Sequence, residues 1–387
     1  MSPRVVIVGN GHAGTTLAAL LRQGGHRGEI VLFGDEANLP YHRPPLSKKF
    51  TGELAQWLRP APFYAEQGID LRLGDQVVSI DRTARRVHAS SSCPYDVLVL
   101  ATGARPRELS VSGAGVGGVV MLRTLEDARA LRKHLVAERR MVIIGGGYIG
   151  LEAAAAARAQ GVDVTIVERE DRVLARVASP ELSAMLAAYH RERGTTIVTN
   201  AVVRRLTSRD RQVRAVVLDD GTAIPCEVVV VGVGAEPRDE LAAGAGLVCE
   251  RGIVVDECAR TGDPAVFAIG DVTRRPVPGV DGAMRLESIP SATEQARQAT
   301  AAILGLDPPS PEVPWFWSDQ FDLKLKIAGV VQPGGEVERR GDPSSGRFAL
   351  YHRDETGDVT AVETANAPAD FMAAKSLLRS RHARSRV

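Results

Sequence analysis

GNGHAG, residues 9–14, directly follows the apolar run Val5–Val8, and GGGYIG, residues 145–150, directly follows the apolar run Met141–Ile144. Each apolar run predicts a buried strand, and the residues after each glycine motif favour a helix. A strand, a tight glycine turn and a helix N-terminus that faces a pyrophosphate are the parts of a dinucleotide-binding unit. Because the chain carries these parts twice, the sequence predicts an α/β fold with two Rossmann-like domains.

In the first motif, each glycine has a separate predicted task. Gly9 makes the tight turn, Gly11 lets the backbone approach the pyrophosphate, and Gly14 lets the helix pack on the strand. The run Glu29–Phe33 predicts the next strand. Asp35 follows it, at roughly the twenty-residue spacing expected of the acid that holds a ribose hydroxyl.

The second motif repeats the pattern with Gly145, Gly147 and Gly150, and Glu168 stands at the end of the following predicted strand. A carboxylate at this point accepts a hydrogen bond from a ribose 2′-hydroxyl and repels a 2′-phosphate, which favours NADH over NADPH. Arg169 and Arg172 lie nearby, and an arginine can receive a 2′-phosphate, so NADPH stays the alternative. Two nucleotide sites on one chain suggest a resident flavin and a visiting nicotinamide that exchange electrons.

The bulk composition narrows the class of protein. A chain of 387 residues is too long for one hydrophobic core, so we expect two or three domains. With 48 basic and 47 acidic residues the net charge is +1, which argues against a nucleic-acid-binding protein. We find neither a signal-peptide pattern nor an apolar run near the ~20 residues of a membrane span, and we therefore expect no membrane association and a cytoplasmic location. The four cysteines form no C-x-x-C pair, so we expect buried or half-buried thiols and no metal site.

Eight stretches make the sequence recognisable. The more specific of them are YHRPPLSK, residues 41–48, and WFWSDQ, residues 315–320. The other stretches are the two glycine motifs, the second extended to Glu152, and Ala101–Gly103, Leu122–Thr124, Phe267–Asp271 and Leu286–Ser288. Together they resemble the FAD-dependent NAD(P)H:ferredoxin reductases of the putidaredoxin reductase and rhodocoxin reductase type, which share the fold of the glutathione reductase superfamily but lack its redox disulfide.

The resemblance implies three domains: a discontinuous FAD-binding domain at 1–110 and 237–310, an inserted NAD(P)H-binding domain at 111–236, and a small α+β C-terminal domain at 311–387. It also implies two sets of binding residues. The FAD set is Gly9, Gly11, His12, Ala13, Gly14, Asp35, Arg43, Lys48, Val77, Ala101, Thr102, Gly103, Arg123, Asp271, Glu287, Ser288, Ile289 and Trp317. The NAD set is Gly145, Gly147, Tyr148, Ile149, Gly150, Glu152, Glu168, Arg176, Gly232 and Gly234.

Lys48 and Glu152 are the expected catalytic residues. By the pattern of residues alone, the Pro-Pro-Leu-Ser segment before Lys48 is a rigid loop that opens a helix, in which Ser47 is a candidate cap. The resemblance adds that Lys48 sits beside the flavin and pairs with Glu152, which positions the nicotinamide. It further implies that Asp271 binds the ribityl chain and that the helix predicted over 290–302 points its N-terminus at the flavin.

The resemblance implies an NADH-dependent ferredoxin reductase that passes electrons through FAD to a [2Fe–2S] ferredoxin serving a cytochrome P450 or a Rieske-type oxygenase. Rubredoxin as acceptor, an NADH oxidase or small-acceptor reductase, and a redox-sensing flavoprotein are the alternatives. His42 stands where a peroxide-reducing enzyme would need a cysteine near the flavin, which argues against that variant. Monomer and weak homodimer both remain open.

The C-terminal region has features of its own. Trp315 and Trp317 alternate as in a strand, and Phe321, Leu323 and Leu325 continue the alternation as a predicted sheet edge. The resemblance implies that Trp317 lies near the flavin edge where a ferredoxin docks. Two departures from the family are Arg238, where asparagine is common, and an expected short C-terminus, whose basic end (379–387) we predict to be a frayed tail.

Overall fold

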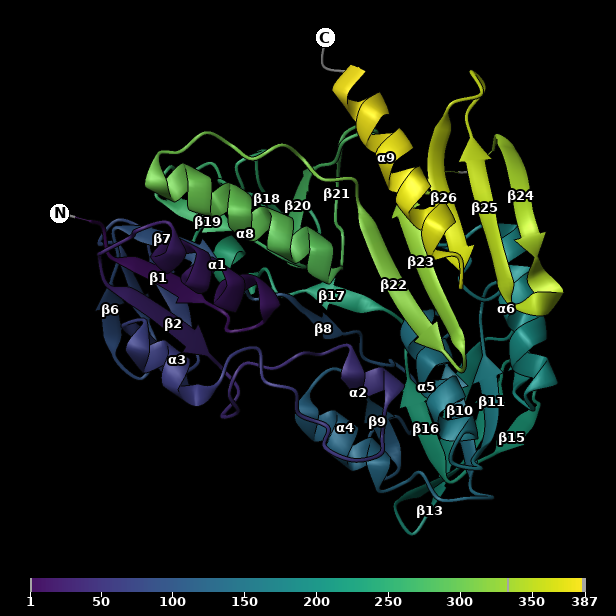
Figure 1. The fold of residues 1–387 in the computed structure, drawn as a ribbon. Coiled ribbons are helices and arrows are strands. Elements are labelled where there is room, and N and C mark those ends of the chain that lie inside the picture. Colours follow the sequence, from purple (N-terminus) through teal and green to yellow (C-terminus); the bar gives the residue numbers. More distant parts are fainter. Residues whose placement is uncertain (1, 333, 385–387) are drawn as a thin grey trace. The chain divides into compact units, whose positions relative to one another are not determined.

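Figure 1 shows the computed structural model of the chain, which describes residues 2–332 and 334–384. The chain divides into two compact units, which are described in turn. Unit 1 comprises the described residues up to His42 together with Ala55–Arg105 and Glu236–Phe316. Unit 2 comprises Arg43–Leu54, Pro106–Ala235 and the described residues from Trp317 onward. The three-domain division stays a prediction.

Unit 1 is built on a five-stranded parallel sheet with the strand order β19-β7-β1-β2-β3. Its strands are β1 (Val5–Val8), β2 (Ile30–Gly34), β3 (Ile69–Leu73), β7 (Val97–Leu100) and β19 (Val266–Ala268). The central strands are continuous runs of buried Val, Ile and Leu, as expected of a parallel sheet that is covered on both faces. Helices α1 (His12–Gln23) and α8 (Ile289–Leu304) pack against each other and contribute alanines and leucines to one of the two clusters that form this core.

The remaining elements of unit 1 are short. They are helices α3 (Ala61–Glu66) and α7 (Glu240–Gly244), the antiparallel strands β4 (Ser79–Asp81), β5 (Arg86–His88) and β6 (Ser92–Pro94), and the strands β18 (Ile253–Val254), β20 (Thr273–Pro276) and β21 (Ala283–Met284). The chain passes between the units at β8 (Ala104–Pro106) and β17 (Ala235–Pro237).

Unit 2 contains a second five-stranded parallel sheet with the strand order β12-β11-β10-β16-β9. Its strands are β9 (Val119–Met121), β10 (Arg140–Ile144), β11 (Asp163–Val167), β12 (Thr196–Val198) and β16 (Val228–Val231). Its helices are α2 (Pro45–Lys48), α4 (Leu125–Arg132), α5 (Tyr148–Arg158) and α6 (Pro180–Glu192). A three-stranded antiparallel sheet of β13 (Val203–Arg209), β14 (Gln212–Leu218) and β15 (Ala223–Pro225) completes this part.

The C-terminal part of unit 2 is a five-stranded antiparallel sheet with the order β22-β23-β26-β25-β24. Its elements are β22 (Trp315–Gln320), whose first two residues belong to unit 1, β23 (Leu323–Gly329), β24 (Glu336–Asp342), the 3₁₀ turn η1 (Pro343–Ser345), β25 (Arg347–Arg353) and β26 (Val359–Ala365). Helix α9 (Pro368–Arg384) packs on β23 and β26 (Figure 1).

The parallel sheets confirm the predicted α/β class, and three local expectations need correction. Phe321 does not continue an edge strand: it occupies a turn at φ 54°, and β23, which follows it, lies inside the sheet between β22 and β26. Ser47 does not cap a helix, because α2 spans only Pro45–Lys48 and Ser47 lies within it. The expected frayed tail is helical as far as Arg384, and 385–387 lie outside the described residues.

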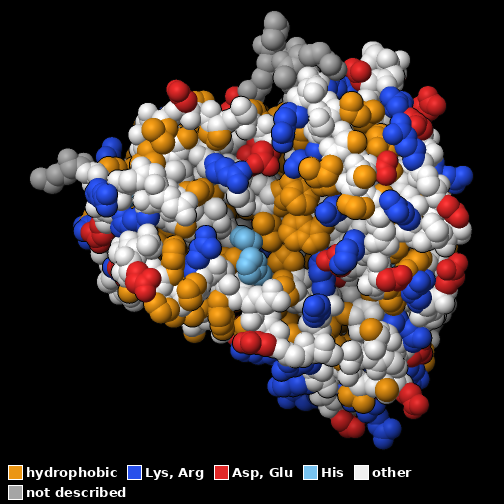
Figure 2. Space-filling view, in the orientation of Figure 1, with side chains coloured by type: hydrophobic (Ala, Val, Ile, Leu, Met, Phe, Trp, Pro, Cys, Tyr) orange, Lys and Arg blue, Asp and Glu red, His pale blue; other side chains and the backbone are white. Residues whose placement is uncertain are grey.

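Surface charge agrees with the composition. On the face shown in Figure 2, basic and acidic side chains are interspersed, as expected of a chain whose net charge is +1. Within 2–332 and 334–384, no helix is long and apolar enough to cross a membrane.

The packing of the second glycine motif gives a test of stability. A Cβ at Gly150 would lie 2.2 Å from the carbonyl oxygen of Gly145, whereas a Cβ at Gly147 would have nothing within 4 Å. We predict that Gly150→Ala lowers the free energy of unfolding by about 2 kcal/mol or more, because α5 must move off β10. Gly147→Ala, the matched control, is expected to cost less than about 1 kcal/mol. Thermal unfolding followed by circular dichroism compares the two variants, and equal losses of stability would contradict this account.

Candidate active site and dinucleotide cradles

In unit 1 the first glycine turn lies where the strand order reverses. Strands β2 and β3 lie on one side of β1, and β7 and β19 lie on the other. Gly9, at the end of β1, has φ +111°, and a Cβ there would lie 2.2 Å from the carbonyl oxygen of Ala101 at the end of β7. Ligands of open α/β sheets bind in the crevice at this kind of reversal. The structure therefore brings Gly9 and Ala101 together at the expected position of a cradle.

The other two glycines of the turn have different surroundings. A Cβ at Gly14 would lie 2.0 Å from the carbonyl oxygen of Gly9, so the helix packs directly on the turn. A Cβ at Gly11 would have nothing within 4 Å, and no side chain caps the helix, α1, that begins at His12. Open space beside an uncapped helix N-terminus fits a pyrophosphate, because the free N–H groups and the helix dipole favour an anion there.

Unit 2 repeats this geometry. Gly145 has φ +109°, and a Cβ there would lie 2.3 Å from the carbonyl oxygen of Gly232, which follows β16 on the other side of the reversal between β10 and β16. A Cβ at Gly150 would collide with the carbonyl oxygen of Gly145, so this position is closed to a side chain. A Cβ at Gly147 would have nothing within 4 Å, so that position is open, and no side chain caps α5. Two segments that share their three glycines thus form the same steric pattern: a closed first glycine, an open second and a closed third.

The two predicted ribose acids are held by different partners. Asp35 forms an ion pair of 2.6 Å with Arg238, whose backbone N–H donates to Gly103 and whose carbonyl oxygen accepts a hydrogen bond from Thr102. Glu168 accepts hydrogen bonds from the backbone N–H groups of Gly146 at 2.6 Å and of Glu170 at 2.9 Å. Each carboxylate is therefore oriented by groups of the protein itself, Asp35 at the end of β2 and Glu168 beside its glycine turn.

Other residues predicted to bind FAD lie at the same end of the unit 1 sheet. Asp271 follows Gly270, where a Cβ would lie 3.0 Å from the Cβ of Ala13 in the first turn of α1. Ser288 caps α8 by accepting a hydrogen bond from the N–H of Ser291, and Ile289 begins that helix. The exposed Glu287 pairs with Arg285. Val77 differs from these residues, because its side chain is buried in the hydrophobic core.

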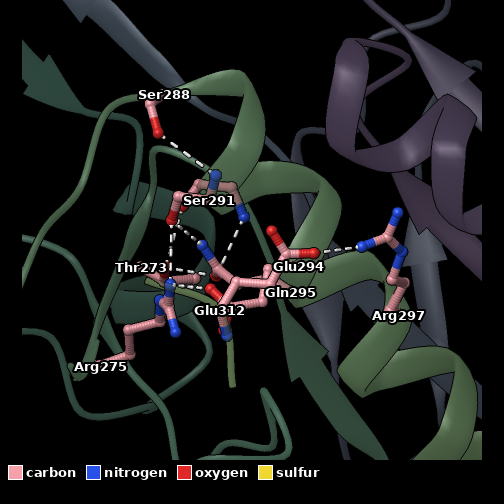
Figure 3. A network of polar contacts seen from close by, with 9 residues as sticks. Thr273, Arg275, Ser288, Ser291, Glu294, Gln295, Arg297 and Glu312 are labelled. Atoms are coloured by element: carbon pink, nitrogen blue, oxygen red, sulfur yellow. Dashed lines mark hydrogen bonds and ion pairs between the residues drawn. The ribbon is translucent and has the colours of Figure 1, made fainter. Parts of the chain in front are cut away.

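A buried polar network fixes the Gly270 turn to the start of α8 (Figure 3). The Gln295 side-chain oxygen accepts hydrogen bonds from the backbone N–H of Gly270 at 3.1 Å and from the hydroxyl of Thr273 at 2.7 Å. The Gln295 side-chain nitrogen donates to Ser291 at 3.2 Å, and Ser291 also accepts from Arg275. Since Gln295 is 1% exposed, these bonds have no competition from water and hold Asp271 at a fixed place relative to α8.

The network continues away from the Gly270 turn through charged groups. Arg275 pairs with Glu294 at 2.7 Å, and both side chains are 5% exposed. Glu294 also accepts the backbone N–H of Glu312, which comes shortly before β22. A buried ion pair of this kind adds little stability by itself, but the loss of one partner leaves an unmatched charge.

Four residues predicted to bind FAD belong to unit 2, together with all of the predicted NAD residues. Arg43 donates to the carbonyl oxygen of Arg123 at 2.9 Å, directly before α4, whose N-cap Thr124 forms a capping box with Asp127. The other two, Lys48 and Trp317, lie together, with the Lys48 ammonium 5.5 Å from the centre of a Trp317 ring. That distance is within the range of a cation–π contact.

Lys48 and Glu152 form the predicted pair. The Lys48 Nζ lies 3.4 Å from Glu152 Oε1, and the two side chains are 12% and 4% exposed. The pairing depends on two elements far apart in the sequence, because α2 packs against α5 and so brings Lys48 to the second turn of α5. The structure therefore places the expected catalytic residues in direct contact.

Further polar groups, which the sequence did not reveal as part of the site, complete the surroundings of the pair. Ser47 donates to Glu152 Oε2, Ser318 donates to Glu152 Oε1 at 2.6 Å, and Asp319 accepts from Lys48 at 2.9 Å. Ser318 and Asp319 belong to WFWSDQ, in which Trp317 was the predicted site residue. The signal available in the sequence was the run of three consecutive polar residues after Trp317.

Burial dominates the electrostatics of Glu152. Desolvation raises the pKa of the Glu152 carboxyl, and this effect outweighs the opposing effects of Lys48, Ser318 and Ser47. A group tuned by burial and by specific partners is typical of functional sites. Burial also raises the pKa of the neighbouring Tyr148 phenol well above its usual range.

A chain of hydrogen bonds continues from this site into α6. Gln320 donates to Ser318 at 3.1 Å and bonds the His190 ring at 3.0 Å. Burial lowers the pKa of His190 to about 4, so the ring is neutral near pH 7. The C-terminal sheet is tied to α6 a second time by Glu363, which accepts from Ser179 and contacts His352 at 3.0 Å. These bonds fix β22 and β26 of the C-terminal sheet to α6.

The remaining residues of the predicted NAD set also lie close to the second glycine turn. Tyr148 begins α5, and Ile149 is exposed beside it. Gly234 has φ +109°, and a Cβ there would lie 3.4 Å from the Arg176 guanidinium. Arg176 and Gly234 are therefore neighbours, although one helix and five strands, α6 and β12 to β16, separate them in the sequence.

Comparison with known proteins supports this description. Residues 3–296 match the pyridine nucleotide-disulphide oxidoreductase family, and residues 315–386 match the reductase C-terminal family. The probable ferredoxin reductase CtmF of Castellaniella defragrans is 46% identical, over 97% of this chain and 93% of that protein. The ferredoxin–NAD(+) reductase component of the biphenyl dioxygenase system of Paraburkholderia xenovorans is 38% identical, over 98% of this chain and 94% of that protein.

A solved structure gives the same result. The crystal structure of the covalent putidaredoxin reductase–putidaredoxin complex matches with a TM-score of 0.94 and 41% identity, over 98% of this chain and 93% of that chain. The chain belongs to the pyridine nucleotide-disulphide oxidoreductase family. It is an oxidoreductase, and the resemblance inferred from its motifs is confirmed.

The two cradles fit the dinucleotides that this family uses. In each cradle the open second glycine and the uncapped helix leave room for a pyrophosphate, and an oriented carboxylate stands beside the turn or at the following strand end. In unit 1, Gly11, Asp35 and Asp271 are the residues suited to hold FAD. In unit 2, Gly147 and Glu168 are suited to NAD(P)H. The individual role of each residue remains a proposal.

The network in Figure 3 generates a test on the cofactor itself. Gln295→Leu leaves the N–H of Gly270 and the hydroxyl of Thr273 without their buried acceptor, so the turn before Asp271 loosens. We predict a roughly tenfold higher Kd for FAD, measured by fluorescence titration of the FAD-free protein, which corresponds to about 1.4 kcal/mol.

Arg297→Ala is the matched control for Gln295→Leu. It removes the pairing of Arg297 with Glu312 from the surface of the same helix, where the Arg297 side chain is 49% exposed. The Kd of this control should stay within about twofold of the wild type. An unchanged Kd in Gln295→Leu would show that the network does not position the FAD-binding residues.

Proposed function

We propose that this oxidoreductase is an FAD-dependent NADH:ferredoxin reductase that supplies a [2Fe–2S] ferredoxin of a cytochrome P450 or Rieske-type oxygenase system. The observation that carries the proposal is the pair of matching glycine cradles, one in each unit, with a buried lysine–glutamate pair beside the second. The similarity to reductases that are named for ferredoxins supports the choice of acceptor.

FAD, when bound, accepts two electrons as a hydride and passes them on singly, which connects a nicotinamide to an iron–sulfur cluster. The chain contributes binding and orientation. Gly11 and the N-terminus of α1 receive a pyrophosphate, Asp35 receives a ribose hydroxyl, and Gln295 keeps the Asp271 turn in place. No acid–base nucleophile is required, because hydride transfer depends on distance and alignment.

Lys48 and Glu152 are proposed to orient the nicotinamide. The Glu152 carboxylate is fixed by two hydroxyl donors, Ser47 and Ser318, and so presents a rigid acceptor to a carboxamide N–H. Lys48 compensates part of its charge, and Trp317 covers the ammonium. A fixed carboxylate in a water-poor site costs little reorganisation when the substrate arrives.

We infer a location in the cytoplasm. All four cysteines are free, and Cys93 and Cys226 are buried, which fits a reducing compartment. Burial raises the pKa of both thiols, so neither is an activated nucleophile.

Anaerobic stopped-flow mixing tests the function. The FAD-loaded protein is mixed with NADH and then with a [2Fe–2S] ferredoxin. We expect rapid bleaching of the flavin absorbance, followed by prompt reoxidation as the ferredoxin is reduced. Reoxidation by oxygen or rubredoxin but by no ferredoxin would overturn the proposed acceptor. Slow bleaching with a long-lived charge-transfer band would instead indicate a redox sensor.

The preference for NADH has its own test. Arg172 donates to the carbonyl oxygens of Ala175 and Ala178 and to Ser183 of α6, whereas Glu168 accepts the N–H of Gly146 in the glycine turn. We predict that Glu168→Gln shifts the ratio of kcat/KM for NADPH to that for NADH upward about tenfold, because the 2′-phosphate is no longer repelled. Glu192→Gln, the same change at an exposed helix end, should leave the ratio unchanged. If Glu168→Gln leaves the ratio of the two kcat/KM values unchanged, Glu168 does not determine the choice between NADH and NADPH.

A further inference from the structure

Lys48 has two carboxylate partners, and the nearer one is not the expected one. Its Nζ lies 2.9 Å from Asp319 Oδ2 and 3.4 Å from Glu152 Oε1. Asp319 is 34% exposed, whereas Glu152 is 4% exposed. One ammonium is therefore shared between a carboxylate that keeps part of its hydration and a carboxylate that has lost almost all of it.

This sharing leaves Glu152 with incomplete charge compensation. Its closest donors are the hydroxyls of Ser47 and Ser318, which are neutral. A neutral donor stabilises a carboxylate less than an ammonium does. If Lys48 paired with Glu152 alone, the full attraction would act on the buried carboxylate, where screening by water is weakest.

We propose that Asp319 is a positioning residue for the reductase site, which shares the Lys48 ammonium with Glu152 and so sets how much positive charge the buried carboxylate receives. The proposal rests on the function proposed above, since it assigns a consequence for NADH oxidation to this sharing. It assigns to Asp319 of the WFWSDQ stretch a role separate from that of its tryptophans.

The groups that face Glu152 are few in the described part of unit 2. Helix α2 contributes Ser47 and Lys48, and β22 contributes Ser318 and Asp319. Helix α5 itself contributes Tyr148, which interacts electrostatically with Glu152 and with the buried Glu363 of β26. His190, reached through Gln320 and Ser318, is neutral near pH 7 and adds no charge. Lys48 is the charged group that contacts Glu152 directly, and Asp319 is the carboxylate that shares it.

Removal of the Asp319 charge should lower the pH at which Glu152 is half protonated. In Asp319→Asn, Lys48 loses its competing carboxylate and moves its charge toward Glu152, and a nearby negative charge also disappears. Both changes favour the ionised form of Glu152, so its titration midpoint should fall by about one pH unit. Ser318→Ala has the opposite effect, because it removes a donor from the ionised form and should raise the midpoint.

Infrared titration of the FAD-loaded protein measures this directly. The C=O stretch of the protonated Glu152 carboxyl is identified as the band that is lost in Glu152→Gln, and its midpoint is followed with pH. Asp319→Asn and, as a second variant, the smaller Asp319→Ser should both lower the midpoint. Asp319→Glu, which keeps the charge, should retain the wild-type value. An unchanged or raised midpoint in both neutral variants would overturn the proposal.

Lys324→Ala supplies the matched control. Lys324 lies 3.7 Å from the other oxygen of Asp319, and its side chain is 75% exposed. Lys324→Ala removes an exposed positive charge next to Asp319. The titration midpoint of Glu152 should stay within about 0.2 pH units of the wild-type value. A shift in this control as large as that in Asp319→Asn would show that general surface charge, and not the sharing of Lys48, sets the midpoint.

The infrared experiment separates this inference from the proposed function. It needs neither NADH nor an electron acceptor. If the midpoint falls as expected but NADH does not bleach the flavin, the sharing stands and the proposed function fails. If NADH bleaches the flavin, the acid limb of the pH–rate profile for bleaching should move to lower pH in Asp319→Asn, in parallel with the infrared midpoint. If the pH–rate profile for bleaching does not shift while the infrared midpoint of Glu152 does, Asp319 does not influence NADH oxidation.

Discussion

One buried contact, between the Lys48 ammonium and the Glu152 carboxylate, requires the surrounding segments of unit 2 to hold both side chains in place. An unmatched charge at this depth would be costly, so each partner requires the other to be held in place. Three segments far apart in the sequence meet this requirement: α2 carries Lys48, α5 carries Glu152, and β22 adds Ser318 and Asp319. The C-terminal sheet therefore contributes side chains to the proposed active site and is more than a covering layer.

The two glycine cradles show how one steric solution is reached twice. In both, the first glycine is closed against the neighbouring strand end, the second is open, and the third is closed against the first. The close approach at Gly9 and Gly145 requires positive φ and the absence of a Cβ. The cradles differ in what surrounds them: a rigid polar network centred on Gln295 in unit 1, and the charged cluster around Glu152 in unit 2. This difference fits one nucleotide that stays bound and one that comes and goes.

Much of this arrangement was predictable from the sequence, because it is local. The strand, turn and helix of each cradle follow one another directly, and the spacing to Asp35 and Glu168 follows from the length of one helix and one strand. The partners of those residues were not predictable. Arg238 reaches Asp35, and Gln320 reaches His190, only through tertiary contacts. Lys48 and Glu152 were paired by resemblance, whereas the role of Asp319 depends on distances that no local pattern encodes.

The central claim is that Lys48 and Glu152 act as one unit in the oxidation of NADH. A double-mutant cycle on the rate of anaerobic flavin reduction tests it with Lys48→Met, Glu152→Gln and the double variant, each corrected for FAD content. The account predicts that the double variant is hardly slower than the slower single variant, with a coupling energy of about 1–3 kcal/mol, because each substitution already disables the pair. Two single effects that multiply in the double variant would show that the residues act independently, and would contradict the account.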